Sequence, residues 1–321
     1  MDLLANLRLK IDRLSEGEYT LGLRAVLLHI ETAFRHLSRG QDRHDETAFT
    51  DAIYRTNQAF EGGIKEAYRV LAGKDPAKMR LHEMECYLEH TTVFRPRVLK
   101  QFANYRSEWR NPAAHDYRLD FDESEAFLAI ISVSAFACLL VDELAKKISY
   151  LKSKAEAESR KADIEQHLAR GETDLLKRTA DILRQFFRIQ RSEPAAAQTQ
   201  AQLEGAIEGF FSATVPDLLL RMDEAVDTGS GVFSDFVVSD GSSRVLIDLK
   251  PYKTLVESGL VRLESHLAYT GLRDGILFVW GENGADLKSR EHHVSSIDGR
   301  ILILEPIPPE KRPIDASRYS Y

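Results

Sequence analysis

Residues 233–250 read FSDFVVSDGSSRVLIDLK and decide the fold of the C-terminal half. Two runs rich in β-branched and aromatic residues, 233–238 and 244–250, predict strands, because such side chains fit a half-buried pleated sheet. Between them lies Asp240-Gly241, a dipeptide that favours the tight turn of a hairpin. The stretch therefore predicts two antiparallel strands joined by a short turn.

The segments on either side of this hairpin alternate between helical and strand patterns. A helix is expected around 202–211, before the hairpin, and another over 256–269, after it. The second helix crosses to a strand at 275–280, and a further strand follows at 300–304. An antiparallel hairpin followed by a helical crossover predicts an α/β domain with a mixed sheet over residues 194–305.

The N-terminal half has a different pattern, without strand signals. Apolar residues recur at helical spacing, as they do through 23–37, and this predicts an all-α bundle over residues 1–150. Residues 151–193 are charged and helix-forming, so we expect a helical connector there. Residues 306–321 contain closely spaced prolines and are expected to form an extended C-terminal tail. The expected fold class is α + α/β.

Composition limits the classes of function. The net charge of −7 over 321 residues gives no general attraction to phosphates, so nucleic-acid binding would need local basic patches or bound cations. The two cysteines, Cys86 and Cys138, provide no disulfide framework, and we expect a cytoplasmic protein. The most apolar run, 126–141, is shorter than the roughly 20 residues of a membrane span, so no membrane role is expected.

Two carboxylates and a lysine are expected to meet at the hairpin. Successive side chains on a strand point to opposite faces, so Asp248 and Lys250 share one face about 6.6 Å apart along the chain. The neighbouring strand brings Asp235 within reach. Carboxylates hold Mg²⁺ or Mn²⁺ against a phosphate, and a lysine can orient the attacking water. Asp235 and Asp248 are thus predicted metal ligands, with Glu208, or else Glu204, as a further ligand from the preceding helix.

This pattern resembles the PD-(D/E)xK nuclease superfamily, whose core runs helix, hairpin strands carrying Asp and then (Asp/Glu)-x-Lys, helix, strand. The resemblance covers roughly residues 195–305 and implies a restriction-endonuclease-like domain that cleaves nucleic acid, DNA by preference. It implies that Asp235, Asp248 and Lys250 are catalytic, and it makes His266 a candidate neighbour of the site. The structural alternative is a salt bridge between Asp248 and Lys250 at the strand end, with His266 as a surface or cap residue.

A second candidate site lies in the N-terminal half, in the segment RNPAAH at 110–115. His115 can act as a general acid or base, and Arg110 can hold developing charge on a phosphate. Because RNA carries its own nucleophile in the 2′-hydroxyl, such a pair would cleave RNA without a metal and leave a cyclic phosphate end. Pro112 favours an extended conformation for Asn111, the residue before it.

This segment resembles the signature of the HEPN superfamily, Arg-x(4–6)-His, often with Asn directly after the Arg, just before the last long helix. The resemblance extends loosely across residues 1–150 and implies that Arg110 and His115 are catalytic, with Asn111 in support. HEPN domains usually pair through this region, which implies a homodimer, and the apolar helix at 126–141 suits such an interface. The structural alternative is that Arg110 and His115 form a buried pair in an inactive dimerisation domain.

A HEPN-like domain joined to a restriction-endonuclease-like domain resembles the architecture of prokaryotic antiviral defence proteins. The leading hypothesis is a dimeric nuclease that hydrolyses DNA, with the HEPN-like half as dimeriser, sensor or second, RNA-directed nuclease. One alternative is an RNase toxin that uses only Arg110 and His115 and recognises its target through the C-terminal domain. Another is a non-catalytic nucleic-acid-binding adaptor that works with partner proteins. Glu291-His292-His293 is predicted to be a solvated polar loop.

Overall fold

The computed structural model describes residues 2–91, 94–115, 120–168, 172–190, 198–222, 233–251, 256–281, 284 and 286–307, except for the side chains of residues 114 and 115. The chain forms two compact units, Met1–Ile148 and Ser149–Tyr321. The expected combination of a helical half and a half with a mixed sheet is confirmed. The HEPN-like and endonuclease-like characters of the two halves stay predictions.

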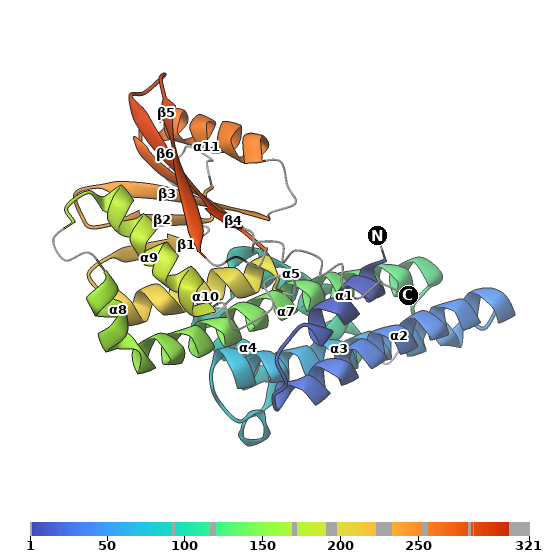
Figure 1. The fold of residues 1–321 in the computed structure, drawn as a ribbon. Coiled ribbons are helices and arrows are strands. Elements are labelled where there is room, and N and C mark those ends of the chain that lie inside the picture. Colours follow the sequence, from blue (N-terminus) through green and yellow to red (C-terminus); the bar gives the residue numbers. More distant parts are fainter. Residues whose placement is uncertain are drawn as a thin grey trace, which may run out of the picture. The chain divides into compact units, whose positions relative to one another are not determined.

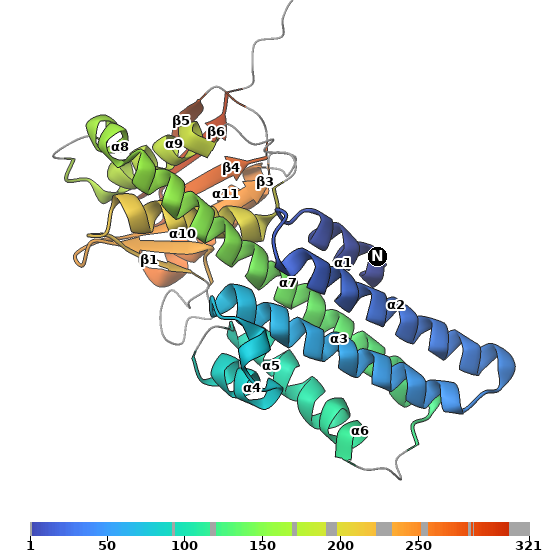
Figure 2. The same ribbon diagram turned by 90° about the horizontal axis from the view of Figure 1, so that it is seen from below.

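The described part of the first unit is helical (Figures 1 and 2). Its elements are α1 (Leu3–Asp12), α2 (Tyr19–Arg43), α3 (Thr47–Leu71), the 3-10 turn η1 (Pro76–Lys78), α4 (Leu81–His90), α5 (Pro96–Tyr105), the π-helix η2 (Arg106–Arg110), α6 (Asn111–His115) and the first part of α7 (Glu123–Ser159). Helices α2 and α3 lie side by side, because each buries an apolar stripe at helical spacing. Phe60 of α3 packs against Phe102, Tyr105 and Phe136, with ring centroids 5.5, 4.8 and 5.3 Å apart.

Helix α7 is, among the described residues, the helix long and apolar enough to cross a membrane. Of its most apolar window, 56% is buried inside the protein, and core helices of soluble proteins pass the same test. The absence of a membrane role therefore stays a prediction. Phe127, Leu128 and Ile131 are exposed on this helix, so part of its apolar surface is left uncovered by the first unit.

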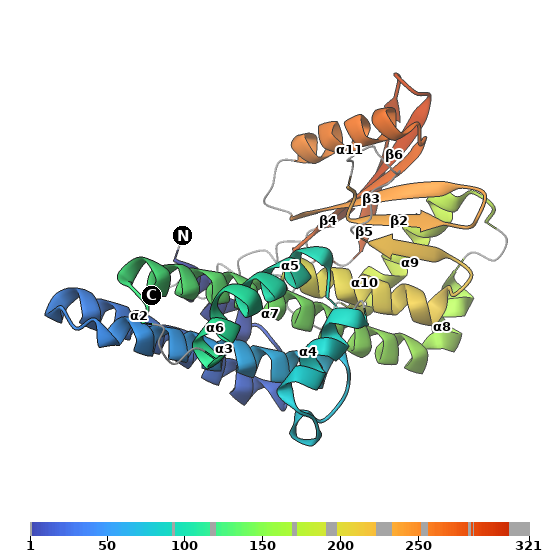
Figure 3. The same ribbon diagram turned by 180° about the vertical axis from the view of Figure 1, so that it is seen from behind.

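The second unit contains a single described sheet with helices on both faces (Figures 1 and 3). Its elements after α7 are α8 (Lys161–His167), α9 (Leu175–Gln190), α10 (Gln200–Thr214), β1 (Leu219–Met222), β2 (Phe236–Ser239), β3 (Arg244–Pro251), α11 (Val256–Thr270), β4 (Asp274–Trp280), β5 (Leu287–Val294) and β6 (Gly299–Pro306). The strand order is β1-β2-β3-β4-β6-β5. Strand β4 is parallel to β3 and to β6, and the other neighbours are antiparallel.

The alternation of side chains along β3 separates the two faces of the sheet. Leu246 packs with Leu263 and Leu267 of α11. Ile247 and Leu249 point the other way, into the core that α9 and α10 cover. Asp248 and Lys250 therefore belong to the α11 face, which is the face on which the candidate site lies.

The second unit differs from expectation at three places. Within the predicted connector, 151–193, α9 buries an apolar stripe in the same core as the sheet. Strands β1 and β5 were not expected. Glu291-His292-His293 lies in β5 and not in a polar loop, and His292 is 2.5 Å from Glu264 of α11.

Candidate active site

Asp248 is a fully buried carboxylate in the middle of the second unit's sheet. A buried charge is costly unless it is paired and hydrogen-bonded. The hydroxyl of Ser234 donates to Oδ1 of Asp248 at 2.9 Å. Arg262 of α11 supplies the countercharge, with Nε at 2.9 Å and Nη2 at 2.7 Å from Oδ2. The partner of Asp248 is thus Arg262, and the structural alternative of a salt bridge between Asp248 and Lys250 is not found among the described residues.

Asp235 lies one residue before β2 and is held from two sides. The backbone N–H of Leu249 donates to its Oδ2 at 2.6 Å, which ties the carboxylate to the neighbouring strand. The side-chain amide of Gln200, the first residue of α10, donates to its Oδ1 at 3.3 Å. The same amide donates to Glu204 at 3.0 Å, so Gln200 joins this buried glutamate to the hairpin.

The two aspartates converge on one cation. Nη2 of Arg262 lies 2.7 Å from Oδ2 of Asp248 and 3.9 Å from Oδ2 of Asp235. The side chain of Arg262 is 43% exposed, whereas those of Asp235 and Asp248 are 18% and 0% exposed. A positive charge therefore enters the site from the solvent side and meets two carboxylates that the hairpin holds in place.

Lys250 follows Asp248 on the same face and lies against Gly259 of α11. A Cβ atom at Gly259 would be 2.9 Å from both Cγ and Cε of Lys250, so the absence of a side chain there makes room for the lysine. Among the described residues, Nζ of Lys250 has neither a hydrogen bond nor an ion pair. The stem of the lysine is therefore held by packing against α11, and no residue in the described part of the chain pairs with its charged end.

His266 lies one helical turn after Arg262 on α11. Its Nδ1 is buried and has no hydrogen-bond partner within the described residues. Burial lowers the pKa of His266; the Asp248 carboxylate opposes this shift, and Arg262 and Lys250 add to it. The histidine is therefore neutral near pH 7 and is partly buried beside the charged group, rather than being a simple surface residue.

The carboxylates of this site differ from the ligand set predicted for Mg²⁺ or Mn²⁺. The described residues contain no group of three histidine, cysteine, aspartate or glutamate side chains able to hold a metal, so Asp235, Asp248 and Glu208 do not form the predicted three-ligand set. Through Gln200, the structure connects Glu204 to Asp235. Mg²⁺ commonly binds one or two carboxylates and completes its shell with water and substrate phosphate. The pair Asp235 and Asp248 supplies carboxylates of that kind, and in this structure the guanidinium of Arg262 lies beside both of them.

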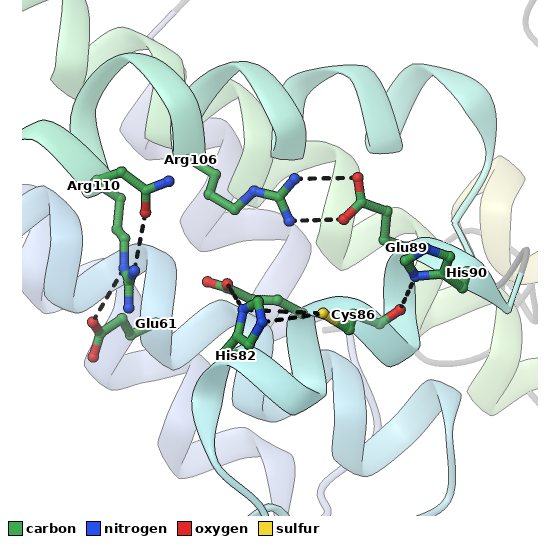
Figure 4. Close-up of polar contacts among 9 residues, drawn as sticks. Glu61, His82, Cys86, Glu89, His90, Arg106 and Arg110 are labelled. Carbon is green, nitrogen blue, oxygen red and sulfur yellow. Dashed lines mark hydrogen bonds and ion pairs between the residues drawn. The ribbon is translucent and has the colours of Figure 1, made fainter.

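The second candidate site surrounds Arg110, at the end of the π-helix (Figure 4). Nη1 of Arg110 donates to the side chain of Asn111 at 3.0 Å, and Nε lies 3.9 Å from Glu61 of α3. Nε is buried without a hydrogen-bond partner in the described part of the chain. Asn111 thus contacts Arg110 directly, and its supporting role in catalysis stays a prediction.

Pro112 does not have its expected effect on the residue before it. Asn111 is helical, with φ −69° and ψ −46°, because it begins α6 and proline is tolerated in the first turn of a helix. The backbone of His115 ends α6, but its side chain lies outside the described residues. The predicted pairing of Arg110 with His115 therefore stays a prediction.

Glu85 of α4 is the buried acid beside this arginine. It is 1% exposed, and its Oε1 has no hydrogen-bond partner within the described residues. Burial raises the pKa of Glu85, and the positive charges of Arg110 and Arg106 oppose this shift. Neighbouring Arg106 is bound to Glu89 through both terminal nitrogens, at 2.7 and 3.2 Å (Figure 4). Nδ1 of His82 also lies 3.9 Å from Oε2 of Glu85, but burial is the larger effect on this carboxyl group and its pKa stays raised.

Replacing Glu85 with glutamine should stabilise the protein near pH 7. The pKa of Glu85 is higher in the folded protein than in the unfolded chain, so protonation of Glu85 favours the folded state at acidic pH. This contribution to the free energy of unfolding is lost as the pH rises through the pKa of Glu85 in the folded protein. Glu85→Gln should therefore raise the free energy of unfolding at pH 7.5 by about 1 kcal/mol and give no gain at pH 4. Urea unfolding at both pH values measures this, with exposed Glu108→Gln as control; an equal change at both values would contradict the role of the charge.

Comparison with protein-family models, with curated proteins and with solved structures finds no match to this chain.

Proposed function

We propose that the second unit is a nuclease that hydrolyses phosphodiester bonds with Mg²⁺ or Mn²⁺, DNA being the favoured substrate. The convergence of Asp235 and Asp248 on one cation carries this proposal. Further support comes from the order of elements, since α10, the β2–β3 hairpin, α11 and β4 follow one another as in the nuclease core that the sequence resembles. The proposed biological role is antiviral defence in the cytoplasm of a prokaryote. In such a role the protein can also act together with separate partner proteins.

Each residue of the site has a distinct role in this proposal. Asp235 and Asp248 would hold the metal, and the hydrogen bonds from Leu249 and Ser234 fix these carboxylates. When bound, the metal neutralises phosphate charge and lowers the pKa of a water molecule. Lys250, with its ammonium uncommitted among the described residues, would orient that water and stabilise charge that develops on the phosphate.

The first unit is proposed to pair two copies of the chain. Phe127, Leu128 and Ile131 of α7 are 48%, 53% and 37% exposed, which leaves apolar surface on the helix that is expected to suit a dimer interface. Large exposed apolar side chains that lie together are typical of protein interfaces. A homodimer through this unit would bring two copies of Arg110 into one assembly.

A second candidate function is cleavage of RNA by the first unit. The observation that favours it is the π-helix that ends at Arg110, because such interruptions of helices are frequent at functional sites. This activity would need no metal and would depend on His115. It would persist in EDTA, in contrast to the activity proposed for the second unit.

The test is cleavage of plasmid DNA and of structured RNA by the purified full-length chain, each with Mg²⁺ and with EDTA. Replacing Lys250 with methionine should lower the Mg²⁺-dependent rate by about 10²-fold, the usual effect of removing one group that stabilises a transition state. Methionine preserves the apolar stem beside Gly259, so the fold should be unaffected. Lys288→Met is the matched control, since Lys288 is exposed on β5 and pairs with Glu305.

The outcomes separate the candidate functions. Metal-dependent loss of DNA that falls in Lys250→Met and not in Lys288→Met supports the nuclease in the second unit. RNA cleavage that persists in EDTA and disappears in His115→Ala would assign the activity to the first unit. Binding of nucleic acid without cleavage under any of these conditions would favour the adaptor.

A further inference from the structure

Arg262 occupies the position that the proposed metal would need. Two of its nitrogens contact the same oxygen of Asp248, and one of them also lies 3.9 Å from Asp235. The sequence patterns that predicted the charged residues of the hairpin did not indicate that Arg262 would join them. The guanidinium thus compensates the charge of Asp248 and lies near Asp235, the two carboxylates that the proposed function assigns to the metal.

We infer that Arg262 exchanges partners during the proposed reaction: it neutralises Asp248 before the metal binds, and afterwards binds a phosphate oxygen of the nucleic acid. This inference rests on the proposed function and adds a residue that binds substrate. It also makes Arg262 a competitor of the metal for the same two carboxylates.

The first half of the exchange follows from charge. A guanidinium and a divalent ion cannot share one oxygen of Asp248 without strong repulsion, because like charges at such short range are unfavourable even near a protein surface. The metal can replace the countercharge that this fully buried carboxylate requires. Arg262 is the partner that can leave, because its side chain is 43% exposed and reaches the site from solvent.

The second half follows from the position of Arg262 on α11. Its displaced side chain would lie at the solvent side of the site, on the same helix as His266 and on the face of the sheet that carries Lys250. The planar, forked guanidinium matches the geometry of phosphate oxygens and keeps its charge at all physiological pH values. A phosphodiester of the nucleic-acid backbone is the ligand that suits both this cation and the adjacent metal.

The test measures metal binding and DNA binding separately, in full-length protein. In calorimetric titration with Mn²⁺ and no nucleic acid, Arg262→Gln should bind the metal about tenfold more tightly than wild type, because the competing cation is gone. With Mn²⁺ present and Lys250→Met added to prevent cleavage, Arg262→Gln should bind a labelled DNA duplex about tenfold more weakly, as measured by fluorescence anisotropy. Arg262→Lys, which keeps the charge, should show a smaller change in both measurements.

Arg290→Gln provides the control, since Arg290 is exposed on β5, which β4 and β6 separate from β3. It should change neither measurement. Equal Mn²⁺ affinity in wild type and Arg262→Gln would overturn the exchange while leaving the metal site intact. Weaker Mn²⁺ binding in Arg262→Gln would also overturn the exchange, because Arg262 would then have a purely structural role. Unchanged DNA binding in Arg262→Gln would overturn it as well. If neither protein binds Mn²⁺, the metal-dependent function itself fails.

Discussion

Replacing Asp248 with asparagine should lower Mg²⁺-dependent cleavage of DNA by about 10³-fold, which is the scale expected when a group that organises charge in a transition state is lost. The carboxylate is fully buried, and its geometry is fixed by Ser234 and Arg262. Asparagine keeps nearly the same shape and can still accept the hydrogen bond from Ser234. It removes the negative charge that a divalent ion requires. Removal of the metal with EDTA should have the same effect on the unaltered protein.

The loss of activity should occur without loss of the fold. Breaking a buried ion pair is strongly destabilising when it leaves a buried charge uncompensated. Asp248→Asn instead removes the buried charge and leaves Arg262, whose side chain is 43% exposed and can be hydrated. Thermal unfolding followed by circular dichroism should therefore show a midpoint within a few degrees of the unaltered protein.

The matched control for Asp248→Asn is Asp240→Asn in the same hairpin. Asp240 is exposed and accepts from the backbone N–H groups of Ser242 and Ser243, each at 2.8 Å, so it shapes the turn and not the site. Asp240→Asn should keep the cleavage rate. If Asp248→Asn cleaves DNA at the unaltered rate, the second unit does not contain the catalytic site proposed for it.

Local sequence patterns predicted the elements that carry the candidate site. The β2–β3 hairpin, α11, β4 and β6 each have an apolar period that matches their structure. The hairpin closes on the pair Ser239 and Arg244, so its loop has four residues and is longer than the two-residue turn that Asp240-Gly241 favours. The alternation along β3 also predicted that Asp248 and Lys250 share a face. These features depend on neighbours close in the sequence, which is why a single chain was sufficient to predict them.

Contacts between elements distant in the sequence were not predictable in the same way. Arg262 has an ordinary place on an amphipathic helix, and only the crossover from β3 to β4 brings it to Asp248. Helix α9 has a clear apolar stripe, but an apolar stripe alone does not predict which element packs against it, here the sheet. The packing of α9 against the sheet was not predicted for this reason.

The two strands that were missed lie at the edges of the sheet. Strand β5 reads Leu-Lys-Ser-Arg-Glu-His-His-Val, and most of its side chains are exposed. Edge strands commonly carry charged residues that discourage pairing with other chains, so they lack the apolar alternation by which strands are predicted. The π-helix before Asn111 likewise has no sequence signature.

Replacing Gly209 with alanine should lower the free energy of unfolding of the second unit by about 3 kcal/mol. A Cβ atom at this position of α10 would lie 2.2 Å from the carbonyl oxygen of Tyr150 and 3.0 Å from the backbone nitrogen of Lys154, both on α7. Backbone atoms cannot rotate away as a side chain would, so α10 and α7 must separate. Urea unfolding of the full-length protein measures the loss.

A control on the same pair of helices is Ser212→Ala, which removes the 3.2 Å contact between the Ser212 and Tyr150 hydroxyls without adding an atom. It should cost no more than about 1 kcal/mol, as expected for one exposed hydrogen bond. Equal stability of Gly209→Ala and the unaltered protein would show that the two helices do not approach so closely in solution.

The same substitution connects helix packing with the candidate site. Helix α10 begins at Gln200, whose amide holds Asp235 and Glu204 together, so a shift of α10 away from α7 should also loosen the carboxylate that faces the metal. At a low temperature at which Gly209→Ala stays folded, this variant should bind Mn²⁺ about 10-fold more weakly than the unaltered protein. Loss of a contact that orients a metal ligand has an effect of this size. Ser212→Ala should leave this affinity unchanged. Unchanged affinity in Gly209→Ala would mean that the hairpin alone, through the Leu249 and Ser234 hydrogen bonds, fixes both carboxylates.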